Sequence, residues 1–229
     1  MTHPALFVGA VAIAMLSGGA SAQSALPDQL RDLVSKIADS GPGLTSAQKA
    51  QRQKEFDSIK TIPAAELRQG PGGRRAVEFC GRGEMRQSAN RVAITGADGQ
   101  IRMVRLAWVF APEEPQRDGR GALVNGMQFA DLKDLCVVVV SEQGQDDRGH
   151  RRYVGTVFNA AGQDVALELL KMGLAWHWTQ YAEKGQNRRA YQQYAAAQKW
   201  TRDWKVGLFA DPHPIAPWTF QQPPSASRK

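Results

Sequence analysis

Residues 92–106 read VAITGADGQIRMVRL, and this stretch carries the strongest indication of the fold. Residues 92–94 form a short apolar run, and apolar and polar side chains alternate over residues 101–106. Between the two segments lies Gly96-Ala97-Asp98-Gly99, in which Asp-Gly supplies the positive φ that a tight turn requires. The stretch therefore predicts two antiparallel strands joined by a hairpin.

Beyond this hairpin, the periodicity changes from that of strands to that of helices. A polar stretch around Pro112 and Pro115 comes first, then a candidate short helix at 129–135 and a buried strand at 136–140. A second hairpin is expected from Arg152 to a turn at 160–163. Helical spacing follows over 165–174, and a long polar helix is expected over about 187–204. Strands followed by helices predict an α+β fold.

Before the hairpin, residues 23–75 predict a helical accessory arm that ends in a linker. Apolar residues at 30, 33, 34 and 37 share one helical face, and a Gly-Pro-Gly break follows at 41–43. Thr45-Ser46 is a candidate cap for a second helix that ends near Ile59, with Phe56 and Ile59 as its apolar contacts. A Gly-rich stretch at 69–75 has the composition of a linker. The arm has too few large apolar residues for a core of its own.

The N-terminus has the pattern of a cleavable secretory signal peptide. An apolar run from Ala5 to Leu16 precedes the small residues Ala20-Ser21-Ala22, and cleavage is expected after about Ala22. The run is shorter than the ~20 apolar residues that span a bilayer. No Lys or Arg precedes it, so a disordered or membrane-tethered N-terminus is the alternative. The signal predicts a secreted or periplasmic protein.

The charge of the chain is basic but dispersed. The formal net charge is +7 and the pI is near 9.6, which suits an acidic partner such as nucleic acid or an anionic surface. Residues 75–221 carry 19 Lys and Arg against 16 Asp and Glu. A mildly basic surface therefore stands beside a dedicated binding groove as an explanation.

Cys80 and Cys136 are the two cysteines of the chain. In an exported protein an even count favours one disulfide, which would stabilise the fold by about 2–4 kcal/mol. Two separate buried thiols are the alternative. With no His at ligand spacing, the pair does not form a zinc site.

Several motifs, in one order, are similar to those of a known family. They are RLAWVFAPE at 105–113, RYVGTVF at 152–158 with GQDV at 162–165, and LKMGLAW at 170–176. Tyr181-Ala182, Gly207-Leu208-Phe209 and Pro217-Trp218 complete the series. Residues 76–221 thus resemble the staphylococcal (micrococcal) nuclease-like, or thermonuclease, family. The resemblance implies a five-stranded Greek-key OB barrel with packed C-terminal helices, followed by a flexible tail at 222–229.

The resemblance also implies a set of site residues. Members of the family cleave phosphodiester bonds with Ca²⁺ held by two aspartates and a backbone carbonyl, while a glutamate acts on water and two arginines neutralise the phosphate. Arg105 resembles the first arginine and Glu113 the general base. Arg152 resembles the second arginine, with Arg151 as the alternative.

Both aspartates that the resemblance requires are replaced. Phe110 stands at one position, and the region from Gln87 to Asn90 has no acid at the other. Without carboxylates the affinity for Ca²⁺ is expected to be millimolar or weaker, so we expect the Ca²⁺-dependent chemistry to be lost and predict no cofactor. Whether Asp118 or Asp146 takes the vacant position is left open.

Three functions follow as hypotheses. The first is an exported binding module for an anionic ligand, either nucleic acid or another phosphate-bearing molecule, or for a protein. The second is an active extracellular or periplasmic nuclease that uses Glu113 with Arg105 and Arg152. The third is a structural module of the envelope whose arm contacts a partner protein. Arg105 and Arg152 have an equally good structural explanation, namely pairing with Glu113.

The aromatic residues have two explanations as well. They could stack on bases, but most are expected to pack in the core. His150 and His177 have no partner at catalytic or metal spacing in the sequence. The aromatic residues concerned are Trp108, Tyr153, Trp176, Trp178, Trp200, Trp204 and Trp218.

Overall fold

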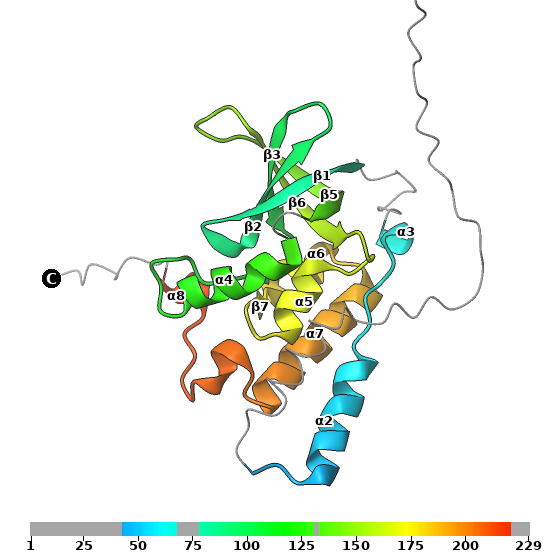
Figure 1. Cartoon of the computed structure of the whole chain (residues 1–229), viewed down its shortest axis with the longest axis vertical. Coiled ribbons are helices and arrows are strands. Elements are labelled where there is room, and N and C mark those ends of the chain that lie inside the picture. The colour runs from blue at the N-terminus through cyan, green and yellow to red at the C-terminus, as the bar shows by residue number, and fades with distance from the viewer. Residues whose placement is uncertain (1–42, 68–77, 131–132, 221–229) are drawn as a thin grey trace, which may run out of the picture.

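The structure is a computed structural model that describes residues 43–67, 78–130 and 133–220 (Figure 1). The predicted signal peptide, the first predicted helix of the arm and the predicted tail lie outside the described residues. A strand-built upper part stands on a helical lower part in Figure 1.

Five strands close into a barrel in the order β1-β2-β3-β6-β5. β3 and β6 pair in parallel, and the other neighbours are antiparallel. A closed mixed barrel with helices beside it confirms the predicted α+β class and OB-type barrel. The strands are β1 (Glu78–Arg86), β2 (Ser88–Gly96), β3 (Ile101–Leu106), β5 (Asp134–Gln145) and β6 (Arg151–Asn159).

The hairpin predicted over residues 92–106 is the β2–β3 pair. Thr95 lies opposite Ile101 at its end, and the Gly99 N–H donates to the Gly96 carbonyl at 3.0 Å. Gly99 has a φ of 72°, the left-handed conformation expected of Asp-Gly. Asp98 accepts from the Gln100 N–H, which fixes the turn.

Strand β1 has no clear signal in the sequence because glycines interrupt it. A Cβ at Gly81 would lie 2.2 Å from the Thr95 carbonyl oxygen, and one at Gly83 would lie 2.3 Å from the Leu135 side chain. These glycines therefore let neighbouring strands approach closely. Glycine weakens a strand, but here it makes closure of the barrel possible.

The helices and two short strands form the lower part of the molecule. The helix predicted at 129–135 is wrong, because α4 already ends at Ala130 and β5 begins at Asp134. The stretch after Pro115, for which the sequence predicted no element before residue 129, contains α4; its Gly126 lies against Ala89 and Met85 of the barrel. The elements are α2 (Ser46–Ser58), α3 (Ala64–Leu67), β4 (Val109–Phe110), α4 (Gly119–Ala130), α5 (Val165–Lys171), β7 (Trp176–His177), α6 (Thr179–Gly185), α7 (Arg188–Asp203), the 3-10 helix η1 (Gly207–Ala210) and α8 (Pro217–Phe220).

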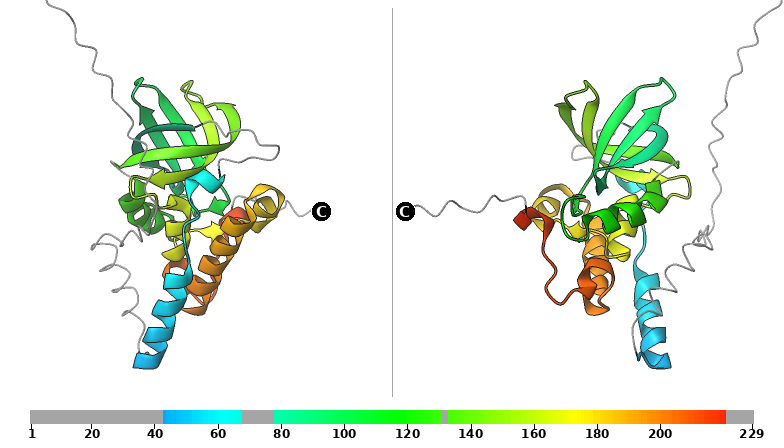
Figure 2. Two further views of the ribbon diagram at one scale, coloured as in Figure 1. Left: turned by 90° about the vertical axis from the view of Figure 1, so that its right-hand side faces the viewer. Right: turned by 60° about the vertical axis from the view of Figure 1, so that its left-hand side comes forward.

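The described part of the arm packs against α7. Thr45 caps α2 in a capping box with Gln48, as the sequence predicts. Phe56 is buried with its ring centroid 5.1 Å from that of Trp200, and Ile59 is buried as well. The two views of Figure 2 show α2 beside α7. The predicted apolar contacts of this helix are therefore confirmed.

Cys80 and Cys136 form a disulfide between β1 and β5, which decides between the two alternatives. They are direct partners in the antiparallel ladder, so the bond joins two adjacent strands of the barrel. Among the described residues, no helix combines the length and the apolar character needed to cross a membrane.

Candidate nucleic-acid interface

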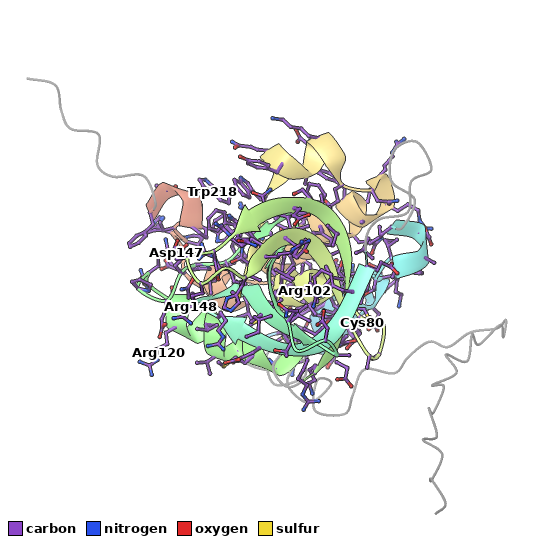
Figure 3. The ribbon with its side chains drawn as sticks, turned by 90° about the horizontal axis from the view of Figure 1, so that it is seen from above. Cys80, Arg102, Arg120, Asp147, Arg148 and Trp218 are labelled. Carbon is purple, nitrogen blue, oxygen red and sulfur yellow. A yellow bond between two sulfur atoms is a disulfide. The ribbon has the colours of Figure 1, made fainter. Side chains whose placement is uncertain are left out.

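A cavity of about 1020 Å³ lies beside the barrel. One wall is the outer face of β2, β3 and β6, a second is the end of the β5–β6 hairpin, and a third is the segment 178–185 that includes α6. Figure 3 looks onto the end of the barrel and shows Asp147 and Arg148, in the β5–β6 turn, on the side opposite Cys80.

Three arginines are brought together on this wall by strand register. Arg91 of β2 lies directly opposite Arg105 of β3. On the other side of β3, Met103 is the partner of Arg152 and Arg105 the partner of Val154. Since side chains two residues apart point to the same face of a strand, Arg105 and Arg152 share a face with Arg91. All three arginines line the cavity.

Arg105 is held among aromatic rings. Its guanidinium carbon lies 4.6 Å from the ring centroid of Phe110 and 5.2 Å from that of Trp178. Its Nη2 is buried and has no hydrogen-bond partner among the described residues. Burial of the guanidinium lowers the pKa of Arg105, and the nearby charges of Arg91 and Arg152 act in the same direction.

The position of Arg151 separates it from Arg152. Arg151 is exposed and contacts Glu142 at 3.6 Å, and its pKa is raised by its hydrogen bond with Tyr153. Arg151 does not line the cavity, whereas Arg152 does. The geometry therefore favours Arg152 as the counterpart of the second arginine.

Glu113 lies to one side of the arginines. Its Oε1 accepts from Nη2 of Arg91 at 2.9 Å, and its N–H donates to Gln116 at 2.6 Å. Glu113 is not among the residues that line the cavity. Arg91, which no sequence motif indicated, therefore holds this carboxylate against the barrel.

The residues at the positions expected to hold Ca²⁺ make packing contacts and hydrogen bonds within the protein. The Phe110 ring packs on Arg105, Trp178 and Trp218, with ring centroids 5.1 Å and 6.4 Å from the two indoles. Asn90 is buried and donates from Nδ2 to the Val109 carbonyl at 3.1 Å, while its Oδ1 accepts from Ser88. These residues do not fit a calcium ion, which prefers several charged oxygens.

Neither alternative carboxylate replaces the missing ligands. Asp118 lies at the start of α4 beside Arg117, and Asp146 accepts from the backbone and ring of His150. Within residues 43–67, 78–130 and 133–220, no three His, Cys, Asp or Glu side chains cluster in a way that could hold a metal ion.

The sequence named Trp178 as a residue that could stack on bases, but it did not predict two side-chain pairs at the cavity. Trp178 and Tyr181 lie with ring centroids 4.0 Å apart, and Tyr181 is 55% exposed. His150, expected to lack a partner, has its Nδ1 3.0 Å from Oδ2 of Asp146. Spacing alone could not show this pair, because the turn between β5 and β6 decides how the two side chains meet.

His177 and the aromatic residues named from the sequence are buried or half-buried within the protein. His177 is buried, its Nε2 lies 3.0 Å from Oε1 of Gln186, and burial lowers its pKa. Of the seven aromatic residues considered, Tyr153, Trp176 and Trp200 are buried, while Trp108, Trp178, Trp204 and Trp218 are half-buried.

Residues 103–211 match the sequence model of the family described as "Staphylococcal nuclease homologue". This chain carries a staphylococcal-nuclease-like domain. The match begins within β3 and contains Arg105, Phe110, Glu113 and Arg152. It also lies inside the range of 76–221 predicted from the sequence motifs.

Individual relatives agree with this assignment to the nuclease family. The chain is 31% identical over 122 residues to "Staphylococcal-like nuclease CAN1" of Arabidopsis thaliana, and the aligned stretch covers 52% of this chain and 33% of that protein. The chain is also 31% identical over 121 residues to "Uncharacterized endonuclease" of Haemophilus influenzae, and that alignment covers 52% of this chain and 61% of that protein. "Probable staphylococcal-like nuclease CAN1" of Oryza sativa is 29% identical over 119 residues, and the alignment covers 52% of this chain and 32% of that protein. The chain thus spans about a third to three fifths of the length of these relatives.

Proposed function

We propose that this protein binds a single strand of nucleic acid through its phosphates in the cavity beside the barrel, without the calcium chemistry of its family. The observation that carries the proposal is the pairing of Arg91 directly opposite Arg105, with Arg152 on the same face. Like charges directly opposite on neighbouring strands destabilise a sheet. Glu113 accepts from Arg91 and offsets part of this repulsion, and a bound phosphate would turn the remainder into attraction.

The buried Nη2 of Arg105 supports an anionic ligand in particular. A buried donor without an acceptor costs about 1–3 kcal/mol, and more when it is charged. The guanidinium carbon lies within about 5 Å of the Phe110 and Trp178 rings, while its buried Nη2 has no acceptor among the described residues. Arginine presents its N–H groups as a planar fork that matches phosphate oxygens.

The aromatic pair at the opposite wall favours nucleic acid over a simple anion. Trp178 and Tyr181 both line the cavity, and Tyr181 is more than half exposed. An exposed ring near phosphate-binding cations is a platform on which a base can stack. Stacking needs an unpaired base, so a single strand is the expected ligand.

Binding is tested by fluorescence anisotropy of a labelled deoxyoligonucleotide at low salt. Arg105→Gln should weaken binding by about 10- to 100-fold, since hydrogen bonds to charged groups contribute about 1.5–3 kcal/mol. Arg82→Gln is the matched control, because Arg82 is exposed on β1 beside Asp134 and does not line the cavity. If both variants bind as the parent does, the cavity is not the site.

The absence of calcium chemistry has its own test. The same deoxyoligonucleotide should stay intact with millimolar Ca²⁺. Cleavage that requires Ca²⁺ and disappears in Glu113→Gln would establish the active nuclease instead. Failure to bind any oligonucleotide at low salt, where phosphate contacts are strongest, would favour an interaction module with a protein partner.

Export is part of the proposal. The Cys80–Cys136 disulfide supports it, because such bonds persist mainly in oxidising compartments. Fractionation of cells that express the whole chain should recover it outside the cytoplasm with a new N-terminus near Gln23. Recovery of the uncleaved chain in the cytoplasm would exclude export.

A further inference from the structure

The β5–β6 turn places a His–Asp pair at the edge of the cavity. His150 and Asp146 both line the cavity, and Nδ1 of His150 lies 3.0 Å from Oδ2 of Asp146. Each side chain is about a quarter exposed. The pair therefore faces the space in which we place the nucleic-acid strand.

The backbone of the turn holds both partners in position. Oδ1 of Asp146 accepts the N–H groups of Arg148 and His150, each at 2.9 Å. The Asp146 N–H donates to the His150 carbonyl at 2.9 Å, and Gly149 turns the chain with a φ of 80°. Two oxygens of one carboxylate thus fix the turn and the imidazole together.

The hydrogen bonds also determine which ring nitrogen of His150 can accept a proton. Although partial burial acts against it, the hydrogen bonds from His150 and Arg148 hold the pKa of Asp146 below its usual range, so this carboxylate is an acceptor. With Nδ1 donating to it, a neutral imidazole has its lone pair on Nε2. No described residue is hydrogen-bonded to Nε2. The pair then has the arrangement of an oriented general base.

The base lies close to the cations that would hold phosphate. His150 immediately precedes β6 and lies two residues before Arg152. His150 and Arg152 both line the cavity. At about 3.3 Å per residue, their Cα atoms are about 7 Å apart. Long side chains extend over such a distance, so one phosphate can contact Arg152 while the sugar next to it faces His150.

We propose that His150, oriented by Asp146, removes the proton from a ribose 2′-hydroxyl, so that the protein cleaves single-stranded RNA without a metal ion. The inference rests on the proposed binding of a strand in the cavity. The 2′-oxygen attacks the adjacent phosphorus and the bond to the 5′-oxygen breaks. The proton of the 2′-hydroxyl passes to Nε2, the leaving oxygen takes a proton from water, and the imidazolium returns its proton to solvent. The products are a 2′,3′-cyclic phosphate and a 5′-hydroxyl, so no oxidant, reductant or other reactant is consumed.

The arginines have a defined part in this reaction. Charge grows on the phosphoryl oxygens as the 2′-oxygen attacks, and fixed cations stabilise that charge. Arg105 and Arg152 are positioned for this purpose by the β3–β6 ladder. DNA lacks the 2′-hydroxyl and is expected to bind without being cleaved.

The experiment uses a deoxyoligonucleotide that contains a single ribonucleotide, with its all-deoxy counterpart, both in excess EDTA. Purified protein should cut the first at the ribonucleotide, leave a 2′,3′-cyclic phosphate, and bind the second without cutting it. His150→Gln should reduce cleavage by at least about 100-fold, as expected for loss of a general base. His213→Gln, prepared in the same way, is the matched control, since His213 lies outside the cavity and the variant should cleave as the parent does.

Two further measurements separate catalysis from a merely structural turn. Added imidazole should restore cleavage to His150→Ala, which a purely structural histidine would not permit. Asp146→Asn should lower kcat about 10-fold with KM for the oligonucleotide unchanged, because Asp146 positions the base and does not bind the strand. Melting temperatures and binding of the all-deoxy strand by each variant establish that it is folded.

Each outcome has one meaning. Binding of both strands with no cleavage in EDTA overturns this inference and leaves the proposed binding function in place. Cleavage that His150→Gln and His213→Gln retain equally also overturns it. If neither strand binds at low salt, both the proposed function and this inference are wrong.

Discussion

Arg52 and Arg105 both lie among aromatic rings, but Arg52 is buried whereas Arg105 is only partly buried. Arg52 of α2 is 3% exposed and lies over Trp200 and Trp204 at 5.3 Å and 5.7 Å. Its carbonyl accepts from Trp200 Nε1 at 3.1 Å, and Glu55 accepts from Trp204 Nε1 at 2.8 Å. Arg105 has a similar pair of rings but opens onto a cavity with Arg91 opposite. The same cation–ring contact thus closes a helix interface in one place and, in the other, holds an arginine at the cavity in which we propose that phosphate binds.

The buried Lys171 of α5 and the buried Asp164, which caps α5, both have partners inside the packing. Lys171 is buried, contacts Glu168 at 3.0 Å, and lies 4.5 Å from the ring centroid of Phe56. Tyr194 donates to Asp164 at 2.7 Å. We call this region, formed by α2, α5 and α7, the packed side.

The largest expected effect concerns Asp164 on the packed side. Burial raises the pKa of Asp164 to about 7, against the hydrogen bonds from Tyr194, Leu167 and Ala166 that favour its charged form. Because the folded state holds the proton more tightly, the stability linked to this group is fully present below about pH 4. It declines as the pH rises to about 7, by on the order of 4 kcal/mol.

Asp164→Asn cannot ionise, so this part of the pH dependence should vanish. Denaturant titrations between pH 4 and pH 8 measure it, with the exposed residue Asp134 changed to Asn as the control. An unchanged slope in the Asp164 variant would show that this carboxyl group does not stay protonated in the folded protein.

Arg52→Met should reduce the free energy of unfolding by about 2–3 kcal/mol, because it removes the cation–ring contacts and the packing of the aliphatic stem. Oligonucleotide binding should be unaffected, since α2 does not line the cavity. Chemical denaturation and anisotropy measure the two quantities. A loss of binding in a folded variant would contradict the separation of the two regions.

Arg105→Met should show the reverse pattern. Binding of the deoxyoligonucleotide should weaken by about 1.5–3 kcal/mol with the loss of a charged donor. The free energy of unfolding should stay the same or rise, because a partly buried cation opposite Arg91 is replaced by an apolar side chain of similar size. If this variant loses as much stability as Arg52→Met, then Arg105 is a packing residue.

The smallest effect is expected for Arg91→Gln, because Glu113 already neutralises part of this charge. A plot of the logarithm of affinity against the logarithm of salt concentration should lose at most ~1 unit of slope. Arg152 is exposed, so the Arg152→Gln variant is the comparison. Its plot should lose about one full unit of slope. Equal slopes for both variants and the parent would place the phosphate contacts elsewhere.

The sequence predicted best where the structure is local. The β2–β3 hairpin follows from its Asp-Gly turn, and α2 follows from the Thr45 cap and from Phe56. The two arginines taken from the family motifs lie on one wall of one cavity. Each of these features depends on residues near one another in the chain or on a recognisable motif.

Features that depend on distant pairs could not be found in this way. β1 contains Gly81 and Gly83 because Thr95 and Leu135 lie against it, and neither neighbour is close in sequence. Arg91 matters because it lies opposite Arg105 across two strands. The His150–Asp146 pair depends on how one turn is closed. In each case a tertiary neighbour, absent from any local pattern, decides the role.

The disulfide has a mechanical consequence. Cys80 and Cys136 are 56 residues apart in the sequence, and β2, β3 and α4 lie between them. A force that pulls the chain from its two ends passes through the sulfur–sulfur bond and bypasses that whole segment. Arg91 and Arg105 lie within the shielded segment, whereas His150 and Arg152 lie outside it. Tension would therefore extend the β6 side of the cavity first and leave its β2–β3 wall unstretched.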